Sequence, residues 1–171
     1  MSWVIWITGL PGSGKSTIAK SLKESISDAV ILRMDAARKT ITPNPCYSDT
    51  EREYVYRSIV FTAKTIYSLG HKVIIDATGS RMIWRDLARE SIEDFYEVYL
   101  ECPLELCIER ERKRTDTQGA PAGIYDKAAK GEPVPGVSAP YEVPLKPDLI
   151  INTERDTPEI AAMKIMRMLD V

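Results

Sequence analysis

Glycines and a lysine at fixed spacing near the N-terminus form the clearest chemical signal in the sequence. The run is Gly9-Leu10-Pro11-Gly12-Ser13-Gly14-Lys15-Ser16-Thr17, which matches G-x-x-x-x-G-K-[ST] at every fixed position. Glycines let the backbone curl so that its N–H groups point at phosphate oxygens, and the N-terminus of a following helix adds a favourable partial charge. We therefore predict an ATP-binding phosphate loop, with Lys15 at the β- and γ-phosphates and Ser16 on Mg²⁺.

A second signal is an acidic residue that ends an apolar run. Residues 72–75 read Lys-Val-Ile-Ile, and Asp76 follows them. Such a run predicts a buried strand, and a carboxylate at the end of a strand beside a phosphate loop holds Mg²⁺ in other proteins of this kind. We predict Asp76 as a metal-binding residue. Its position before Ala77, Thr78 and Gly79 resembles P-loop kinases that act on gluconate or polynucleotides, while a helix N-cap or loop position stays open as the alternative.

A basic cluster closes the helix that is predicted to start at Pro103. Its members are Arg110, Arg112, Lys113 and Arg114. Guanidinium groups bind phosphate through two parallel hydrogen bonds and also stack on aromatic rings. Arg110 is therefore predicted to contact ATP, either at its phosphates or at its adenine, and a solvated helix end is the alternative.

The phosphate loop alone does not separate a kinase from an ATPase, a GTPase or a binding module. The guanine-reading pattern N-K-x-D is missing from the sequence, which disfavours a GTPase. Residues 115–141 are rich in glycine and proline and are long for a simple connection, which is typical of a lid or binding loop. A transfer enzyme needs a lid to keep water away from the γ-phosphate, so a small-substrate kinase is favoured.

The elements that must position these residues alternate along the chain. Apolar runs predict strands over residues 4–8, 29–34, 72–76, 95–100 and 148–151. Between them, helical spacing predicts helices over 15–27, from Ser48 to Gly70, over 82–92, from Pro103, and from Pro158. Strands that alternate with helices predict an α/β fold, in which helices cover both faces of a parallel sheet.

Bulk properties limit the setting in which this chemistry takes place. The chain has 171 residues, which suits a single kinase domain over 1–171. Its net charge of −2 gives no field that attracts long nucleic acid, and it has no apolar run that is long enough to span a membrane and no signal peptide. We expect a cytoplasmic protein that binds a small nucleotide; whether it forms a homodimer is left open.

At this point the chain resembles the adenylylsulfate kinases, which use ATP to phosphorylate the ribose 3′-hydroxyl of adenosine 5′-phosphosulfate (APS). The resemblance runs from Trp3 to about Asn152. Its most specific segments are residues 9–17, 101–107 (Glu-Cys-Pro-Leu-Glu-Leu-Cys), 123–132 and 138–142. It implies a P-loop NTPase sandwich of three layers with strand order 2-3-1-4-5, ATP and Mg²⁺ as cofactors, and APS as the acceptor.

The resemblance also implies roles for residues that match the acceptor motifs of the family. The family's Asp-Gly-Asp-x-x-Arg keeps its second Asp and its Arg here, as Asp35 and Arg38. Asp35 would orient or deprotonate the acceptor hydroxyl and help hold Mg²⁺, and Arg38 would bind the anionic group of the substrate. Tyr47 and Arg52 match an aromatic residue and an arginine five positions later, and Lys127 matches the lysine of the lid. The implied catalytic residues are Lys15, Asp35 and Lys127.

Several acceptor positions depart from the family pattern. The family's Phe-Ile-Ser-Pro after the third strand is Ala-Thr-Gly-Ser at residues 77–80, an Asn is Val55, and the lid phenylalanine that sandwiches adenine aligns with Val134. Thr78, Gly79 and Val134 are therefore expected in a pocket that grips adenine less tightly. Two alternatives stay open: a kinase of another nucleotide-linked hydroxyl, such as that of cytidine diphosphoramidate, and a nucleotide-binding regulatory module without transfer activity.

Overall fold

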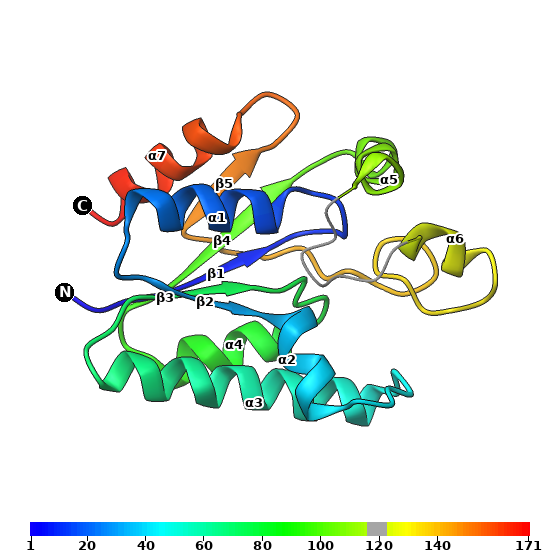
Figure 1. Ribbon diagram of the computed structural model, residues 1–171, viewed down its shortest axis with the longest axis horizontal. Coiled ribbons are helices and arrows are strands. Elements are labelled where there is room, and N and C mark those ends of the chain that lie inside the picture. The colour runs from blue at the N-terminus through cyan, green and yellow to red at the C-terminus, as the bar shows by residue number, and fades with distance from the viewer. Residues whose placement is uncertain (116–122) are drawn as a thin grey trace.

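One parallel sheet forms the centre of the protein. The computed structural model describes residues 1–115 and 123–171 (Figure 1). Its five strands are β1 (Val4–Thr8), β2 (Val30–Arg33), β3 (Val73–Asp76), β4 (Phe95–Glu101) and β5 (Leu149–Asn152). They pair in parallel in the order β2-β3-β1-β4-β5, which confirms the predicted sheet and its strand order.

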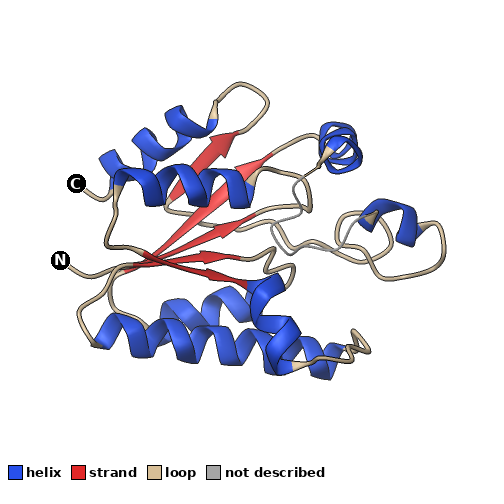
Figure 2. Cartoon of the chain, in the orientation of Figure 1, coloured by secondary structure: helices blue, strands red, loops and turns tan. Residues whose placement is uncertain are grey.

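Helices cover both faces of this sheet, as Figure 2 shows. On one face, α1 (Lys15–Ser25) and α7 (Pro158–Met168) pack over a core that includes Ile5, Ile7 and Leu22. On the other face, α3 (Asp49–Ser68) and α4 (Met82–Ser91) pack over a core that contains Trp6 and Ile75. The central strands are continuous apolar runs because both of their faces are buried between helices.

Two short helices were not anticipated from the sequence. α2 (Met34–Ile41) follows β2 with no intervening loop, so Asp35 lies in its first turn. α6 (Ile124–Ala128) lies in the glycine- and proline-rich stretch. Residues 116–122, which belong to the stretch predicted as a lid or binding loop, lie outside the described residues.

The five strands point the same way, so their carboxyl ends meet at one edge of the sheet. Register pairs Asp76 with Ile7 of β1 and with Arg33 of β2, which brings the end of β3 beside the start of the phosphate loop. Beyond this edge lie α5 (Leu104–Lys113) and α6 (Figure 1). This edge is where open α/β sheets bind their ligands.

Across the described ranges 1–115 and 123–171, we find no helix with the length and apolar character that crossing a bilayer requires.

Candidate active site

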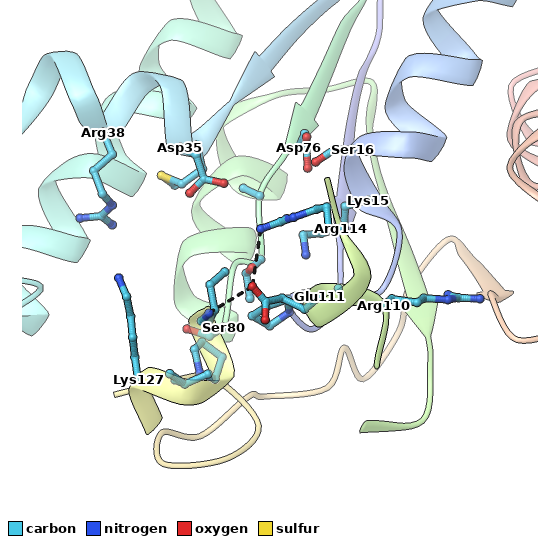
Figure 3. Close-up of a pocket in the computed structure, with 18 of the residues that line it drawn as sticks. Lys15, Ser16, Asp35, Arg38, Asp76, Ser80, Arg110, Glu111, Arg114 and Lys127 are labelled. Carbon is cyan, nitrogen blue, oxygen red and sulfur yellow. Dashed lines mark hydrogen bonds and ion pairs between the residues drawn. The ribbon is translucent and has the colours of Figure 1, made fainter. Parts of the chain in front are cut away.

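A cavity of about 630 Å³ opens at the carboxyl edge of the sheet, a volume typical of small-molecule sites. Of the residues that the sequence predicted for the site, most line this cavity: Pro11, Gly12, Gly14, Lys15, Ser16, Thr17, Asp35, Arg38, Tyr47, Arg52, Asp76, Thr78, Arg110, Lys127 and Val134. The other four predicted residues, Gly9, Leu10, Ser13 and Gly79, do not belong to the lining within the described part of the chain. Figure 3 shows that the labelled residues converge from several separate elements.

The phosphate loop joins β1 to the first turn of α1, as its sequence predicts. The amine of Lys15 donates hydrogen bonds to the carbonyls of Gly9 (3.1 Å) and Leu10 (2.8 Å), so it lies folded over its own loop. Gly12 has a φ of 79°, and a Cβ there would lie 2.3 Å from the carbonyl oxygen of Cys107. A side chain at this position would therefore push the loop away from α5.

Lys15, Ser16 and two carboxylates form the electrostatic centre of the cavity. Burial lowers the pKa of Lys15, whereas the negative charges of Asp76 and Asp35 act in the opposite direction. Burial raises the pKa of Asp76, while the charge of Lys15 and a hydrogen bond with Ser16 oppose that rise. The Nε of Arg33 lies 3.9 Å from Oδ2 of Asp76. The positive charge of Arg33 also opposes the rise in the pKa of Asp76.

The structure shows where Asp76 lies relative to β3 and α4. It ends β3, 7 % of its surface is exposed, and it lines the cavity, whereas the N-cap of α4 is Arg81. The alternative of a helix N-cap is therefore wrong. The hydroxyl of Ser16 and the carboxylates of Asp35 and Asp76 offer the hard oxygen donors that suit Mg²⁺, so these residues fit that ion.

The half of the cavity away from the phosphate loop is built around Tyr47. The guanidinium carbon of Arg38 lies 5.1 Å from the centre of the Tyr47 ring, within the range of a cation–π contact. The Nε of Arg52 donates a hydrogen bond of 3.1 Å to the carbonyl of Tyr47. The amine of Lys127 extends from α6 into the same cavity (Figure 3). Three cations thus line this half of the cavity together with one half-buried aromatic ring, which suits an anionic ligand that carries a base or sugar.

The segment that replaces the family's Phe-Ile-Ser-Pro is fixed from below by side chains. The indole N–H of Trp6 donates a hydrogen bond to the backbone carbonyl of Ala77 (2.9 Å), and the hydroxyl of Thr8 donates one to the backbone carbonyl of Thr78 (2.6 Å). The amide of Gly79 donates to the hydroxyl of Tyr56 (3.0 Å). These hydrogen bonds fix the segment at the cavity wall, where Ala77, Thr78 and Ser80 belong to the lining.

Gly79 has a structural role rather than a place in the cavity wall. Its φ is 54°, and a Cβ there would lie 2.9 Å from the ring of Trp6. Its carbonyl accepts a hydrogen bond from the buried guanidinium of Arg85, which also pairs with Glu97 at 2.5 Å. Contrary to the expectation from the sequence, Gly79 is not among the residues that line the cavity. It forms a turn that lies against the ring of Trp6.

Two family positions that diverge in this sequence are buried. Val134 is 3 % exposed and packs with Cys107 and Tyr125, so only a small part of it reaches the cavity. Val55 is completely buried in the core under α3. The nearby aromatic rings are held elsewhere: the hydroxyl of Tyr125 donates to the carbonyl of Pro11 (2.6 Å), and that of Tyr141 is bonded to Thr8 (2.9 Å).

Arg110 lies at the far end of the cavity from Arg38. Its guanidinium donates hydrogen bonds to the carbonyl (2.7 Å) and the hydroxyl (3.3 Å) of Thr153, just after β5. In Figure 3 it points away from Lys15 and Asp76. This position separates Arg110 from the acidic centre and places it beside the loop that follows the edge strand.

Sequence reasoning missed several residues that shape the site. Glu111 is buried in the wall, where it accepts a hydrogen bond from the amide of Ile124 (3.1 Å) and so ties α5 to the start of α6. Tyr56, Ser80 and Glu132 also line the cavity. A single acidic residue within a basic helix end was the available signal for Glu111; the other three depend on contacts between distant segments and give no local signal.

Comparison with known proteins agrees with this geometry. The adenylylsulphate kinase family model matches residues 1–152. An adenylyl-sulfate kinase of Thermodesulfovibrio yellowstonii is 38% identical over 178 residues, covering 98% of this chain and 84% of that protein. A probable adenylyl-sulfate kinase of Archaeoglobus fulgidus is 34% identical over 162 residues, covering 91% and 99%. The structure of a Mycobacterium tuberculosis APS kinase in complex with AMPPNP and APS superposes with a TM-score of 0.86 at 28% identity, covering 99% of this chain and 98% of that one. Since the family model spans most of the chain and both relatives match nearly all of it, the protein belongs to the adenylylsulfate kinase family.

Proposed function

We propose that this protein transfers the γ-phosphoryl group of ATP to the ribose 3′-hydroxyl of a nucleotide, with APS as the acceptor. The observation that carries the proposal is the composition of one cavity. It joins a complete phosphate loop to Asp35 and to the three cations Arg38, Arg52 and Lys127. A module that only binds ATP has no use for this second, cationic half, which disfavours the reading as a regulatory module.

The ATP half contains the phosphate loop, Ser16 and Asp76. Lys15 would leave the carbonyls of Gly9 and Leu10 and bind the β- and γ-phosphates. Ser16, Asp35 and Asp76 would hold Mg²⁺, which neutralises charge on the phosphates. Arg110, beside Thr153, would contact the adenine of ATP; its distance from the acidic centre favours this role over a phosphate clamp.

The acceptor half would hold the second nucleotide against Tyr47. Arg38 and Arg52 would bind its anionic group, and Asp35 would orient the hydroxyl or accept its proton. Lys127 would approach the transferred phosphoryl group from the predicted lid, of which the structure describes residue 115 and residues 123–141. Most of the rate acceleration would come from positioning and from charge stabilisation within this cavity.

A second acceptor is favoured by one specific observation. Val134 is buried against Cys107 and Tyr125, so one side of the expected adenine sandwich offers little aliphatic surface and no ring. A kinase of another nucleotide-linked hydroxyl, such as that of cytidine diphosphoramidate, therefore stays as the alternative. The two are separated by measuring ADP release with a panel of acceptors that includes APS and pyrimidine nucleotides.

The acceptor panel also tests the proposal as a whole. Turnover that depends on APS supports it, and turnover that depends on a pyrimidine nucleotide alone replaces APS by the alternative. ATP binding without any acceptor-dependent ADP release would overturn the kinase assignment for this chain.

A further inference from the structure

Glu51, in the first turn of α3, is bonded to residues that form the acceptor half of the cavity. We propose that Glu51 is a positioning residue: its carboxylate holds the guanidinium of Arg38 and the ring of Tyr47 in the geometry that receives the acceptor. The inference rests on the proposed function only in treating Arg38 and Tyr47 as acceptor-binding residues. Glu51 itself stays behind them and is not part of the cavity lining within the described residues.

Both carboxylate oxygens of Glu51 accept hydrogen bonds. Oε1 accepts hydrogen bonds from the guanidinium of Arg38 (2.9 Å) and from the amide of Tyr47 (3.2 Å), and Oε2 accepts one from the amide of Cys46 (2.7 Å). The side chains of Arg38 and Glu51 are only 13% and 12% exposed. One carboxylate thus joins α2, the preceding turn and the start of α3 at a point where little water competes with it.

Tyr47 needs this support because its backbone is strained. Its φ of 55° lies in the left-handed region, which costs free energy for any residue with a side chain. Such a conformation persists only where its surroundings hold it on several sides. Here the amide is held by Glu51, and the carbonyl is held by Arg52 at 3.1 Å.

The local sequence explains Glu51 differently, as the second half of a capping box with Ser48. The first half of that motif is present, since the hydroxyl of Ser48 accepts the amide of Glu51 at 3.2 Å. In a capping box the carboxylate returns to the amide of the N-cap residue. Here it reaches one and two residues further back, to Tyr47 and Cys46, and across to Arg38. Its contacts therefore serve the acceptor side rather than the helix end.

This arrangement leaves Arg38 able to bind a ligand. A guanidinium carries five N–H donors in a fixed fork, and Glu51 occupies part of one side. Hydrogen bonds from Cys46 and Tyr47, with the charge of Arg38, lower the pKa of Glu51, so the carboxylate is ionised at neutral pH. The other donors of Arg38 would bind the anionic group of the acceptor, and the guanidinium carbon lies 5.1 Å from the centre of the Tyr47 ring, so one carboxylate positions both groups.

The test compares Glu51→Gln with a matched control, Glu53→Gln. Glu53 is on the same helix, is 46% exposed and pairs only with Arg57 among the ion pairs of the described residues. Glutamine keeps the shape of Glu51 but turns an amide donor towards the existing donors. We expect Glu51→Gln to raise the acceptor KM at least about tenfold with little change in the ATP KM, since small misplacements of positioning groups cost up to roughly 10²-fold. Glu53→Gln should behave as wild type.

A double-mutant cycle separates positioning from a general loss of stability. Since Glu51 acts partly through Arg38, Glu51→Gln should raise the acceptor KM by a clearly smaller factor in the Arg38→Ala background than in wild type, and the remaining increase reflects Tyr47. Additive effects, or an acceptor KM for Glu51→Gln within about twofold of wild type, would overturn the inference.

Amide hydrogen exchange gives a readout that needs no acceptor. Glutamine has one acceptor oxygen in place of two, so at least one of the amides of Cys46 and Tyr47 loses its partner, and peptides that contain these residues should exchange faster in Glu51→Gln and not in Glu53→Gln. Unchanged exchange would overturn the inference. If wild type turns over neither APS nor another nucleotide, the proposed function fails by itself, and the exchange result still decides whether Glu51 holds this turn.

Discussion

The guanidinium of Arg52 donates a hydrogen bond of 3.1 Å to the backbone carbonyl of Pro133, which lies 81 residues later in the chain. The same side chain also holds the carbonyl of Tyr47 through its Nε. Arg52 therefore joins the aromatic wall of the acceptor half to the segment that follows α6. Arg52, which the sequence predicts only as an anion-binding residue, therefore also links the predicted lid to the rest of the site.

Replacing Arg52 should weaken acceptor binding and loosen the segment that it holds. In Arg52→Ala we expect an acceptor KM raised at least about tenfold, because hydrogen bonds to charged groups contribute about 1.5–3 kcal/mol each. The amides of residues 134–139 should also exchange faster. Arg57→Ala, on the exposed side of the same helix, is the control. An ATP KM that rises as much as the acceptor KM would show that Arg52 does not belong to the acceptor half.

Replacing Lys15 should remove catalysis and leave the fold intact. Within the residues that the structure describes, the amine donates its hydrogen bonds to the loop carbonyls of Gly9 and Leu10, so its loss removes transition-state stabilisation rather than core packing. For Lys15→Ala we expect kcat to fall by roughly 10²-fold or more. The melting temperature should stay close to that of Lys20→Ala, an exposed control on α1. Turnover within a few-fold of wild type would refute the phosphate-loop assignment.

Gly79→Ala should destabilise the protein more than Gly70→Ala does. Both glycines have positive φ values, 54° and 87°, so alanine strains the backbone at either position by about 1–2 kcal/mol. A Cβ on Gly70 would meet nothing within 4 Å, whereas one on Gly79 would press on the ring of Trp6 at 2.9 Å. Denaturant unfolding of the two variants isolates the contact with Trp6. Equal decreases in the free energy of unfolding would mean that the segment around Thr78 shifts to accommodate the new methyl group without loss of stability.

Cys107 should resist alkylation in the folded protein. Burial raises the pKa of its thiol to about 12, and the thiolate is the reactive form. At about pH 8.5, iodoacetamide should label the exposed Cys46 and spare Cys107 until the chain unfolds, as peptide mass spectrometry would record. The unfolded thiol loses its proton near 9.0, so this group's contribution to the free energy of unfolding declines as pH rises from there to about 12. Rapid native labelling of Cys107 would contradict its buried position.

The acceptor pocket should bind adenine with lower affinity than the pocket of a family member that has two aromatic walls. Stacking a base on an aromatic ring is worth about 1–3 kcal/mol, so the loss of one ring predicts roughly tenfold weaker binding or more. Tyr47 lines the cavity, while Tyr125 and Tyr141 are bonded to Pro11 and Thr8. Competition between APS and cytidine nucleotides with a free 3′-hydroxyl measures the preference. Strong selectivity for APS at low micromolar KM would contradict this prediction.

The sequence by itself determined the sheet and the ATP half of the site. The strand that ends at Thr8, the loop to Ser16 and the helix that follows are contiguous, so their spacing contains nearly all the information that positions them. The same holds for Asp76 at the end of an apolar run. Apolar runs and helical periodicity also predict the five strands and the five longer helices within a few residues, because burial of each element depends mainly on its own pattern, whereas the short helices α2 and α6 were missed.

The arrangement of residues in the acceptor half follows only from the tertiary structure. Its wall joins Arg38 to Glu51, Arg52 to Pro133 and Gly79 to Trp6, and no short-range pattern encodes such pairs. A local motif was even misleading for Glu51, which reads as a helix cap but bonds to Cys46, Tyr47 and Arg38. Val134 likewise aligns with a stacking position and is buried against Cys107 instead. These outcomes depend on how segments far apart in the sequence compete for the same space and the same hydrogen bonds, and that competition is resolved only when the chain is packed.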